Sequence, residues 1–235
     1  NPTTKNIIKG MYNADAMIYA GHGVFLDGNY DEKGGIATPP FGMVGSDGII
    51  WGFGENMVDG STGKSFQAPF KKNIPVILFG ACFSCGWVEK NEVANPTETI
   101  YNFSQMFTGA GANYYATAYT RSYNCTDIVD LVAVFLNVAN SLGDANNKNF
   151  GQTITRSVTC EGQVIWHDNH GYNAFVGNWN GTFPQPKQTT PYNDTAAEEW
   201  YDGNLPNPTV ELPNAETKNE DYPSQLIDEF LSWIN

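Results

Sequence analysis

The sequence predicts an α/β layer sandwich in which helices cover a parallel sheet. Residues 14–20 and 74–79 are apolar runs with little alternation, and each ends at a glycine-containing turn. Such runs are typical of strands buried on both faces of a parallel sheet. Other stretches place apolar residues three and four positions apart, which is the spacing of amphipathic helices. The order strand, helix, strand, helix favours the layered architecture.

The individual elements follow from these patterns in chain order. The glycine-rich stretch 34–66 shows no helical spacing, and we interpret it as a long loop of the kind that often shapes a binding site. Further strands are expected at 112–119 and within 163–183, and helices at 97–107, 127–142 and 224–234.

The chain is strongly acidic, and its charge is unevenly distributed. The 235 residues include 12 Lys plus Arg and 25 Asp plus Glu, which gives a net charge of −13. Such a chain repels phosphate backbones and has no basic patch, so nucleic-acid binding is not expected. No run of 18 apolar residues encodes a transmembrane helix. Residues 181–235 alone carry a net charge of −8, which is typical of a solvated tail.

These patterns predict three regions: a core at 1–183, an acidic, proline-rich linker at 184–222 and a C-terminal amphipathic helix at 223–235. The low lysine content, abundant Asn and Thr, and aromatic richness favour a secreted or cell-surface protein. The four cysteines, too few to form a disulfide framework, leave open both one bridge and four free thiols. They are Cys82, Cys85, Cys125 and Cys160.

Two reactive side chains follow the first two predicted strands. His22 comes after the first strand and Cys82 after the second. Neighbouring strands of a sheet lie about 5 Å apart. If these two strands are parallel neighbours, both side chains therefore lie close together at one edge of the sheet. An imidazole beside a thiol can take its proton, which makes Cys82 a candidate nucleophile. Considered alone, a buried cysteine is more often an inert core residue than a nucleophile. A lone histidine usually has its hydrogen bonds satisfied by neighbouring groups and has no catalytic role.

The residues around this pair resemble those of the caspase-like (clan CD) cysteine peptidases, nearest to the gingipain-like and CHAT-domain branches. Residues 19–23 (YAGHG) and 76–82 (VILFGAC) carry the resemblance. The likeness continues more weakly through 107–117, 135–143 and 150–154 to 175–177. It implies a caspase-like three-layer α/β/α sandwich with a mostly parallel central sheet.

The resemblance also implies an activity. In such a peptidase His22 and Cys82 form a dyad that cleaves peptide bonds through a thioester acyl-enzyme. The backbone amides of Gly23 and Cys82 match the oxyanion donors. The substrate is then a peptide or protein, and no cofactor is required.

The residue before the cut is selected by a charged or polar pocket in such peptidases. An acidic pocket selects Arg or Lys, whereas Arg121 selects Asp, and the sequence leaves both possibilities open. The pocket candidates are Asp47, Glu55 and Asp59 in the long loop, or Tyr119 and Arg121 after the third strand.

Three features depart from the family pattern. Only about 13 residues precede the His22 strand, whereas the fold normally has one or two earlier strands, one of them beside it. We therefore expect a fragment or processed product, with another polypeptide segment supplying the missing strand or strands. Gly80 stands where many relatives have Asp or Ser. Cys85 follows Cys82 closely, and a bridge between them would block the nucleophile until it is reduced.

Other functions compete with peptide hydrolysis. The alternative is a catalytically inactive caspase-like scaffold or binding module on the cell surface. A zinc site from the two Cys at 82–85 and the two His at 167–170 is disfavoured, because the His spacing is too short; these histidines are better read as a polar turn near the cleft. Asp27, Asn29 and Asp31 alternate as calcium ligands would, but the loop lacks the usual final Glu.

Overall fold

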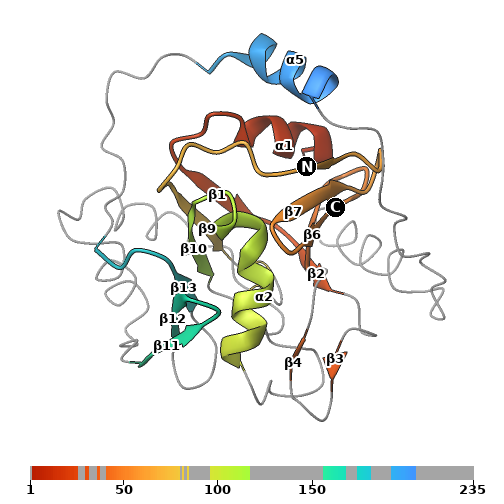
Figure 1. Cartoon of the computed structure of the whole chain (residues 1–235). Coiled ribbons are helices and arrows are strands. Elements are labelled where there is room, and N and C mark those ends of the chain that lie inside the picture. The colour runs from red at the N-terminus through yellow and green to blue at the C-terminus, as the bar shows by residue number, and fades with distance from the viewer. Residues whose placement is uncertain are drawn as a thin grey trace.

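The protein was described from a computed structural model that places residues 2–25, 30–31, 36–37, 41–79, 81, 84, 96–116, 156–167, 174–180 and 192–204. These residues form a mixed α/β fold with two principal sheets and helices packed on them (Figure 1). The predicted α/β class is therefore confirmed. The expected helices at 127–142 and 223–235 lie outside the described residues.

The main sheet has six strands and is mixed. β1 (Met17–Ala20), β9 (Pro75–Phe79) and β10 (Asn113–Ala116) pair in parallel, and the remaining pairings are antiparallel. The sheet continues from β10 through β13 (Ala174–Val176), β12 (Gln163–His167) and β11 (Arg156–Cys160). Parallel pairing is thus confined to the half of the sheet that contains the two predicted motifs.

Burial on both faces, as predicted for the first two strands, is found for β9 but not for β1. Val76, Ile77 and Leu78 are fully buried, and because successive side chains face opposite ways, both faces of β9 are covered. In β1, Met17 and Tyr19 are buried, whereas Ile18 on the other face is 36% exposed. β1 is the terminal strand of the described sheet, so it has a strand neighbour on one side alone.

β11 was not expected from the sequence, although a signal for it exists. Glu161 (φ 47°) and Gly162 (φ 81°) both have left-handed backbone, and they form the two-residue connection between β11 and β12. Two successive left-handed residues are typical of a type I′ hairpin turn, which matches the twist of the flanking strands. This hairpin adds an antiparallel end to the sheet.

The stretch 41–66, expected as a loop, is a β-meander. Together with β2 (Gly23–Phe25), it forms an antiparallel sheet in the order β2, β5 (Phe41–Val44), β6 (Ile49–Phe53), β7 (Asn56–Asp59) and β8 (Ser65–Phe66). Two of its glycines allow neighbouring side chains to pack closely against the backbone. A Cβ on Gly52 would collide with Met106, and one on Gly42 would lie 2.5 Å from Ile49. A short pair, β3 (Tyr30–Asp31) and β4 (Ile36–Ala37), stands apart from both larger sheets.

Helix α2 (Pro96–Thr108) confirms the predicted helix at 97–107. Its predicted apolar stripe, Ile100, Phe103, Met106 and Phe107, is buried. The helix contacts β10 and β12 of the main sheet and β6 of the meander, so it lies between the two sheets (Figure 1). The hydrophobic core is built around it, and Phe103 stacks on Phe41 of the meander at 5.2 Å between ring centroids.

Two further helices pack on each other at one side of the fold (Figure 1). α1 (Thr4–Met11), which the sequence did not lead us to expect, begins after Thr3, whose side chain accepts a hydrogen bond from the backbone N–H of Asn6 at 3.2 Å. α5 (Asp194–Asn204) lies inside the expected linker at 184–222. The acidic segment therefore contains a folded helix at this position and is not solvated throughout.

The acids of α5 are used in this packing. Asp194, Glu198 and Asp202 recur every four residues, so they share one side of the helix. Lys9 of α1 lies 2.8 Å from Asp194, and it also pairs with Glu198. Lys5 pairs with Glu198 and Asp202. Part of the negative charge of the tail thus holds α5 against a basic side of α1.

A candidate active site at the carboxyl edge of the main sheet

β1 and β9 are parallel neighbours, as the two motifs require. Their register pairs Met17 with Val76 and Ala20 with Phe79, so both strands end at the same level. The chain leaves both strands at the same edge, where His22 follows β1 by two residues. Cys82, with Gly80 and Cys85, lies outside the described residues, and its proximity to His22 remains a prediction.

The turn that carries His22 is held by Tyr19. The Tyr19 phenol donates to the backbone oxygen of His22 at 2.8 Å and accepts from the backbone N–H of Val44 at 3.0 Å. The ring folds back beneath the turn, and a Cβ at Gly21 would lie 2.7 Å from the phenol oxygen. Glycine is therefore needed at position 21 for this anchor. The backbone of His22 is fixed while its side chain is exposed.

The backbone amide of Gly23 is oriented away from the meander. Val44 donates its backbone N–H to the oxygen of His22 at 3.0 Å, and Gly23 pairs with Met43 in the antiparallel register. In such a ladder, hydrogen-bonded and non-hydrogen-bonded pairs alternate. The pair of Gly23 and Met43 is then non-hydrogen-bonded, so the Gly23 N–H faces away from β5. This orientation is compatible with the expected role of an oxyanion donor.

The turn after β9 is tied to the neighbouring strand by Tyr114. The backbone N–H of Ser84 donates to the oxygen of Ala81 at 3.2 Å. The buried Tyr114 hydroxyl of β10 donates to the backbone oxygen of Ser84 at 2.6 Å. Tyr114 is itself fixed by stacking on Phe107 of α2, with ring centroids 5.5 Å apart. Ser84 is thus bonded both to Ala81, which follows β9, and to the neighbouring strand β10.

Asp59 has a structural role in place of the expected pocket role. Its side chain is fully buried and accepts hydrogen bonds from the backbone N–H and hydroxyl of Ser61, at 2.9 and 2.7 Å, and from the Tyr201 hydroxyl. Burial raises the pKa of Asp59, but the hydrogen bonds from Tyr201 and Ser61 outweigh this effect and lower it overall. A buried carboxylate with these partners has no surface for a substrate.

Asp47 and Glu55, the other acidic pocket candidates, lie at opposite ends of β6. Asp47 accepts the backbone N–H of Thr4 at 2.7 Å and so caps the first turn of α1. Glu55 is exposed in the turn between β6 and β7, where it lies against Gly109 after α2. The meander therefore does not bring the three carboxylates together into one acidic pocket.

The remaining candidates fall largely outside the described residues. These are Tyr119, Arg121, Asp27 and Asn29, while Asp31 lies in β3. Among the residues that are described, no group of three His, Cys, Asp or Glu side chains could hold a metal ion. In that same part of the chain, no helix combines the length and apolar character needed to cross a membrane.

His167 is the last residue of β12 and pairs with Ala174 of β13. Ala174 in turn pairs with Ala116, the last residue of β10. The end of β12 therefore lies at the same edge of the sheet as the ends of β1, β9 and β10. The rest of the expected polar turn, residues 168–170, lies outside the described residues.

Sequence reasoning missed the two tyrosines that anchor the turns. Tyr19 and Tyr114 lie on strands whose apolar character predicts burial, but their hydroxyl partners are set by folding. A buried tyrosine needs a hydrogen-bond partner for its hydroxyl, and here both partners are backbone groups at the edge of the sheet. In comparisons with protein-family models, with curated proteins and with solved structures, the chain matches none.

Proposed function

We propose that the protein is a cysteine endopeptidase whose catalytic dyad is His22 and Cys82. The observation that carries this proposal is the parallel pairing of β1 and β9, with Ala20 opposite Phe79. In the sequence, His22 and Cys82 thus follow closely after two adjacent strands that end together. A nucleophile with a neighbouring base is the minimal arrangement for covalent acyl transfer.

The proposed reaction has two stages. The His22 imidazole takes the proton of the Cys82 thiol, and the thiolate attacks the carbonyl carbon of the scissile peptide bond. The carbonyl oxygen becomes an oxyanion, which the amides of Gly23 and Cys82 stabilise by hydrogen bonds. His22 then gives its proton to the leaving nitrogen, and the C–N bond breaks to leave a thioester. A water molecule that gives a proton to His22 hydrolyses this thioester and regenerates the thiol.

The substrate pocket is proposed to favour an acidic residue before the cut. Asp59 is buried, and Asp47 caps α1, so neither supports a preference for Arg or Lys. Arg121 follows β10, the parallel neighbour of β9. Matched fluorogenic peptides with Asp or Arg before the cleaved bond test this preference: faster cleavage of the Asp peptide, reversed or lost in Arg121→Glu, is expected. Faster cleavage of the Arg peptide would contradict it.

Labelling with an acyloxymethyl-ketone probe tests the dyad. Under reducing conditions, which keep Cys85 from bridging to Cys82, the probe is expected to modify Cys82 at neutral pH. His22→Ala should slow labelling roughly a hundredfold or more, the range of general-base catalysis. Cys125→Ser is the matched thiol control and should leave labelling unchanged. If Cys82 reacts no faster than Cys125 and His22→Ala has no effect, the scaffold or binding-module alternative is favoured.

We further propose that an extended segment of another polypeptide pairs with the outer edge of β1. The described residues contain no strand on that side of β1, and Ile18 is exposed on one face. Residues 17–20 include no Pro or charged side chain of the kind that protects an edge. Intact mass and N-terminal sequencing of native material test this idea. A second peptide retained after purification is expected, whereas a stable monomer of the 235-residue chain alone would refute it.

A further inference from the structure

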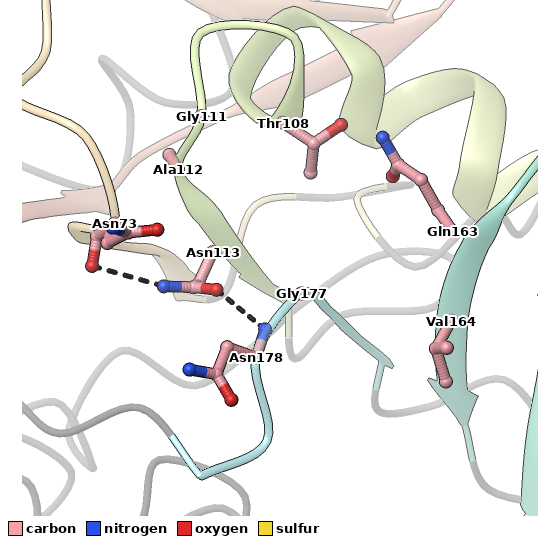
Figure 2. A pocket seen from close by; sticks show the side chains of 9 residues that line it. All are labelled: Asn73, Thr108, Gly111, Ala112, Asn113, Gln163, Val164, Gly177 and Asn178. Carbon is pink, nitrogen blue, oxygen red and sulfur yellow. Dashed lines mark hydrogen bonds between the residues drawn. The ribbon is translucent and has the colours of Figure 1, made fainter.

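A second candidate site lies at the opposite, amino-terminal edge of the main sheet (Figure 2). It is a pocket of about 260 Å³ between the connection from α2 to β10, the start of β12 and the residues that follow β13. The lining residues are Asn73, Thr108, Gly111, Ala112, Asn113, Gln163, Val164, Gly177 and Asn178. Because β1 and β9 carry the proposed dyad at their carboxyl ends, this pocket lies at the other end of the strands.

The lining includes several polar side chains but no charged one. Five of its nine residues carry a carboxamide or a hydroxyl, and none carries a charge, although the chain has a net charge of −13. Two side-chain atoms, Oγ1 of Thr108 and Oε1 of Gln163, are buried without a hydrogen-bond partner. Leaving such atoms unpaired is costly, and they are rare in folded proteins. Both atoms are covered from solvent, so a bound group that donates hydrogen bonds would satisfy them once the two side chains turn toward the pocket.

The opposite wall is held in place by Asn113. Its carboxamide donates to the backbone oxygen of Asn73 at 3.1 Å and accepts from the backbone N–H of Asn178 at 2.7 Å, as the dashed lines in Figure 2 show. The carboxamide thereby joins the ends of three chain segments. This wall is therefore built before any ligand binds.

The backbone at the rim is unusual. Asn73 (φ 64°), Gly111 (φ 84°) and Gly177 (φ 130°) all have positive φ. A Cβ at Gly177 would collide with the Asn113 carboxamide, so only glycine lets the chain pass this close. Positive φ is ordinary for glycine, so Asn73 is the residue of the three whose backbone lies in a sparsely populated region, of the kind that clusters at ligand sites.

We propose that this pocket binds a small, uncharged ligand with several hydroxyl groups, of the size of a single sugar ring. Hydroxyls can donate to Gln163 Oε1 and can either donate to or accept from Thr108 Oγ1. A charged ligand is disfavoured, because no lining side chain offers a counter-charge. The volume lies below the roughly 300–1,000 Å³ that is typical of sites for larger ligands. The proposal does not depend on the peptidase reaction.

Titration of the whole chain with glucose, galactose and N-acetylglucosamine, followed by ¹H–¹⁵N NMR, tests the proposal. At least one of these sugars is expected to shift the side-chain amide signal of Gln163 and the backbone signals of Gly177 and Asn178. Glucuronate, the carboxylate counterpart of glucose, should bind at least threefold more weakly. Equal shifts for glucose and glucuronate would contradict an uncharged specificity.

Two near-isosteric variants locate the binding. Thr108→Val and Gln163→Met remove the unpaired polar atoms and should each weaken sugar binding roughly threefold to tenfold, the loss of about one hydrogen bond. Thr195→Val and Gln67→Met make the same changes at exposed positions outside the pocket lining and should leave binding unchanged. If no sugar shifts these signals and the two pocket variants only raise the melting temperature, the pocket holds water alone and the proposal fails.

Discussion

The Tyr201 hydroxyl of α5 donates a hydrogen bond to Oδ2 of Asp59 at the end of β7, 142 residues away in the sequence. Both side chains are buried. Two cations also lie over the ring of Tyr201, with Lys5 Nζ and Lys64 Nζ each 4.9 Å from its centroid. This contact connects a helix of the acidic segment to the meander, so α5 is an integral part of the fold.

Tyr201→Phe is expected to destabilise the protein by about 1–3 kcal/mol, because it leaves a buried carboxylate short of one donor. Urea unfolding of the whole chain measures the change. Tyr192→Phe is the matched control: its hydroxyl donates to the backbone oxygen of Lys9 at 2.9 Å, but the residue is 55% exposed, so water can replace the bond. An equal loss in both variants would show that the pairing with Asp59 has no special importance.

The docking of α5 on α1 should depend on pH. Hydrogen bonds from Lys5 and Lys9 lower the pKa of Glu198 to about 2 from an ordinary value of 4.5. A lowered folded-state pKa means that the stabilisation is full above about pH 4.5 and is lost as the pH falls toward 2. The pKa of Lys9 is raised by hydrogen bonds to Asp194 and Glu198, so its contribution is full below pH 10.5 and declines above it.

Comparison of the wild type with Glu198→Gln tests this pH dependence. The wild type should be the more stable of the two near neutral pH, and the difference should shrink below pH 4.5 and also with added salt, since these side chains are partly exposed. Glu199→Gln, an adjacent exposed acid, serves as the control and should show a smaller change. A difference that stays constant from pH 7 to pH 2 would rule out the ion pairs as its source.

Gly60→Ala is expected to destabilise the protein by about 1–3 kcal/mol, the usual cost of forcing extra volume into a packed site. A Cβ at Gly60 would lie 2.5 Å from the backbone oxygen of Ile49, and backbone cannot move aside as a side chain can. Gly10→Ala is the matched control in α1, where a Cβ meets nothing within 4 Å. It should stabilise the protein by about 0.5–1 kcal/mol. Thermal unfolding distinguishes the two outcomes.

Cys160 provides an internal reference for thiol reactivity. Burial raises its pKa above the ordinary 9.0, and Glu98 and Glu161 raise it further, so iodoacetamide should modify it slowly at neutral pH. Its labelling rate should rise with the thiolate fraction, by about tenfold per pH unit, and should still be rising above pH 9.0, because the folded-state pKa lies above that ordinary value. Glu161→Gln should shift this rise to lower pH. Rapid labelling of Cys160 at pH 7 would contradict the assigned environment.

Tyr114→Phe tests the anchor of the turn after β9. Loss of the hydrogen bond to the Ser84 oxygen should destabilise the protein by about 1–2 kcal/mol. If the proposed dyad is correct, probe labelling of Cys82 should also slow severalfold, while alkylation of Cys160 stays the same. Tyr192→Phe, at the exposed tyrosine that precedes α5, should affect neither rate. Loss of stability without any change at Cys82 would give Tyr114 a purely structural role.

Sequence patterns identified the elements whose burial depends on the spacing of apolar residues within a few positions of the sequence. The unbroken apolar run of β9 and the spaced stripe of α2 each predict a buried element, and both are found. The meander was missed because Gly42 and Gly52 read as loop residues, although they make room for Ile49 and for Met106 of α2. A glycine in a sequence does not show whether it bends the chain or admits a neighbour.

The sequence by itself determined the α/β class and the two motifs that end at His22 and Cys82, because apolar runs and turn residues act within a few positions. Tertiary structure decided that β1 and β9 are parallel neighbours. It also decided that Asp59 is a buried partner of Tyr201 and that the acids of α5 bind Lys5 and Lys9. The same carboxylate can face solvent, substrate or a distant helix, and the choice depends on partners that only folding brings within hydrogen-bond distance.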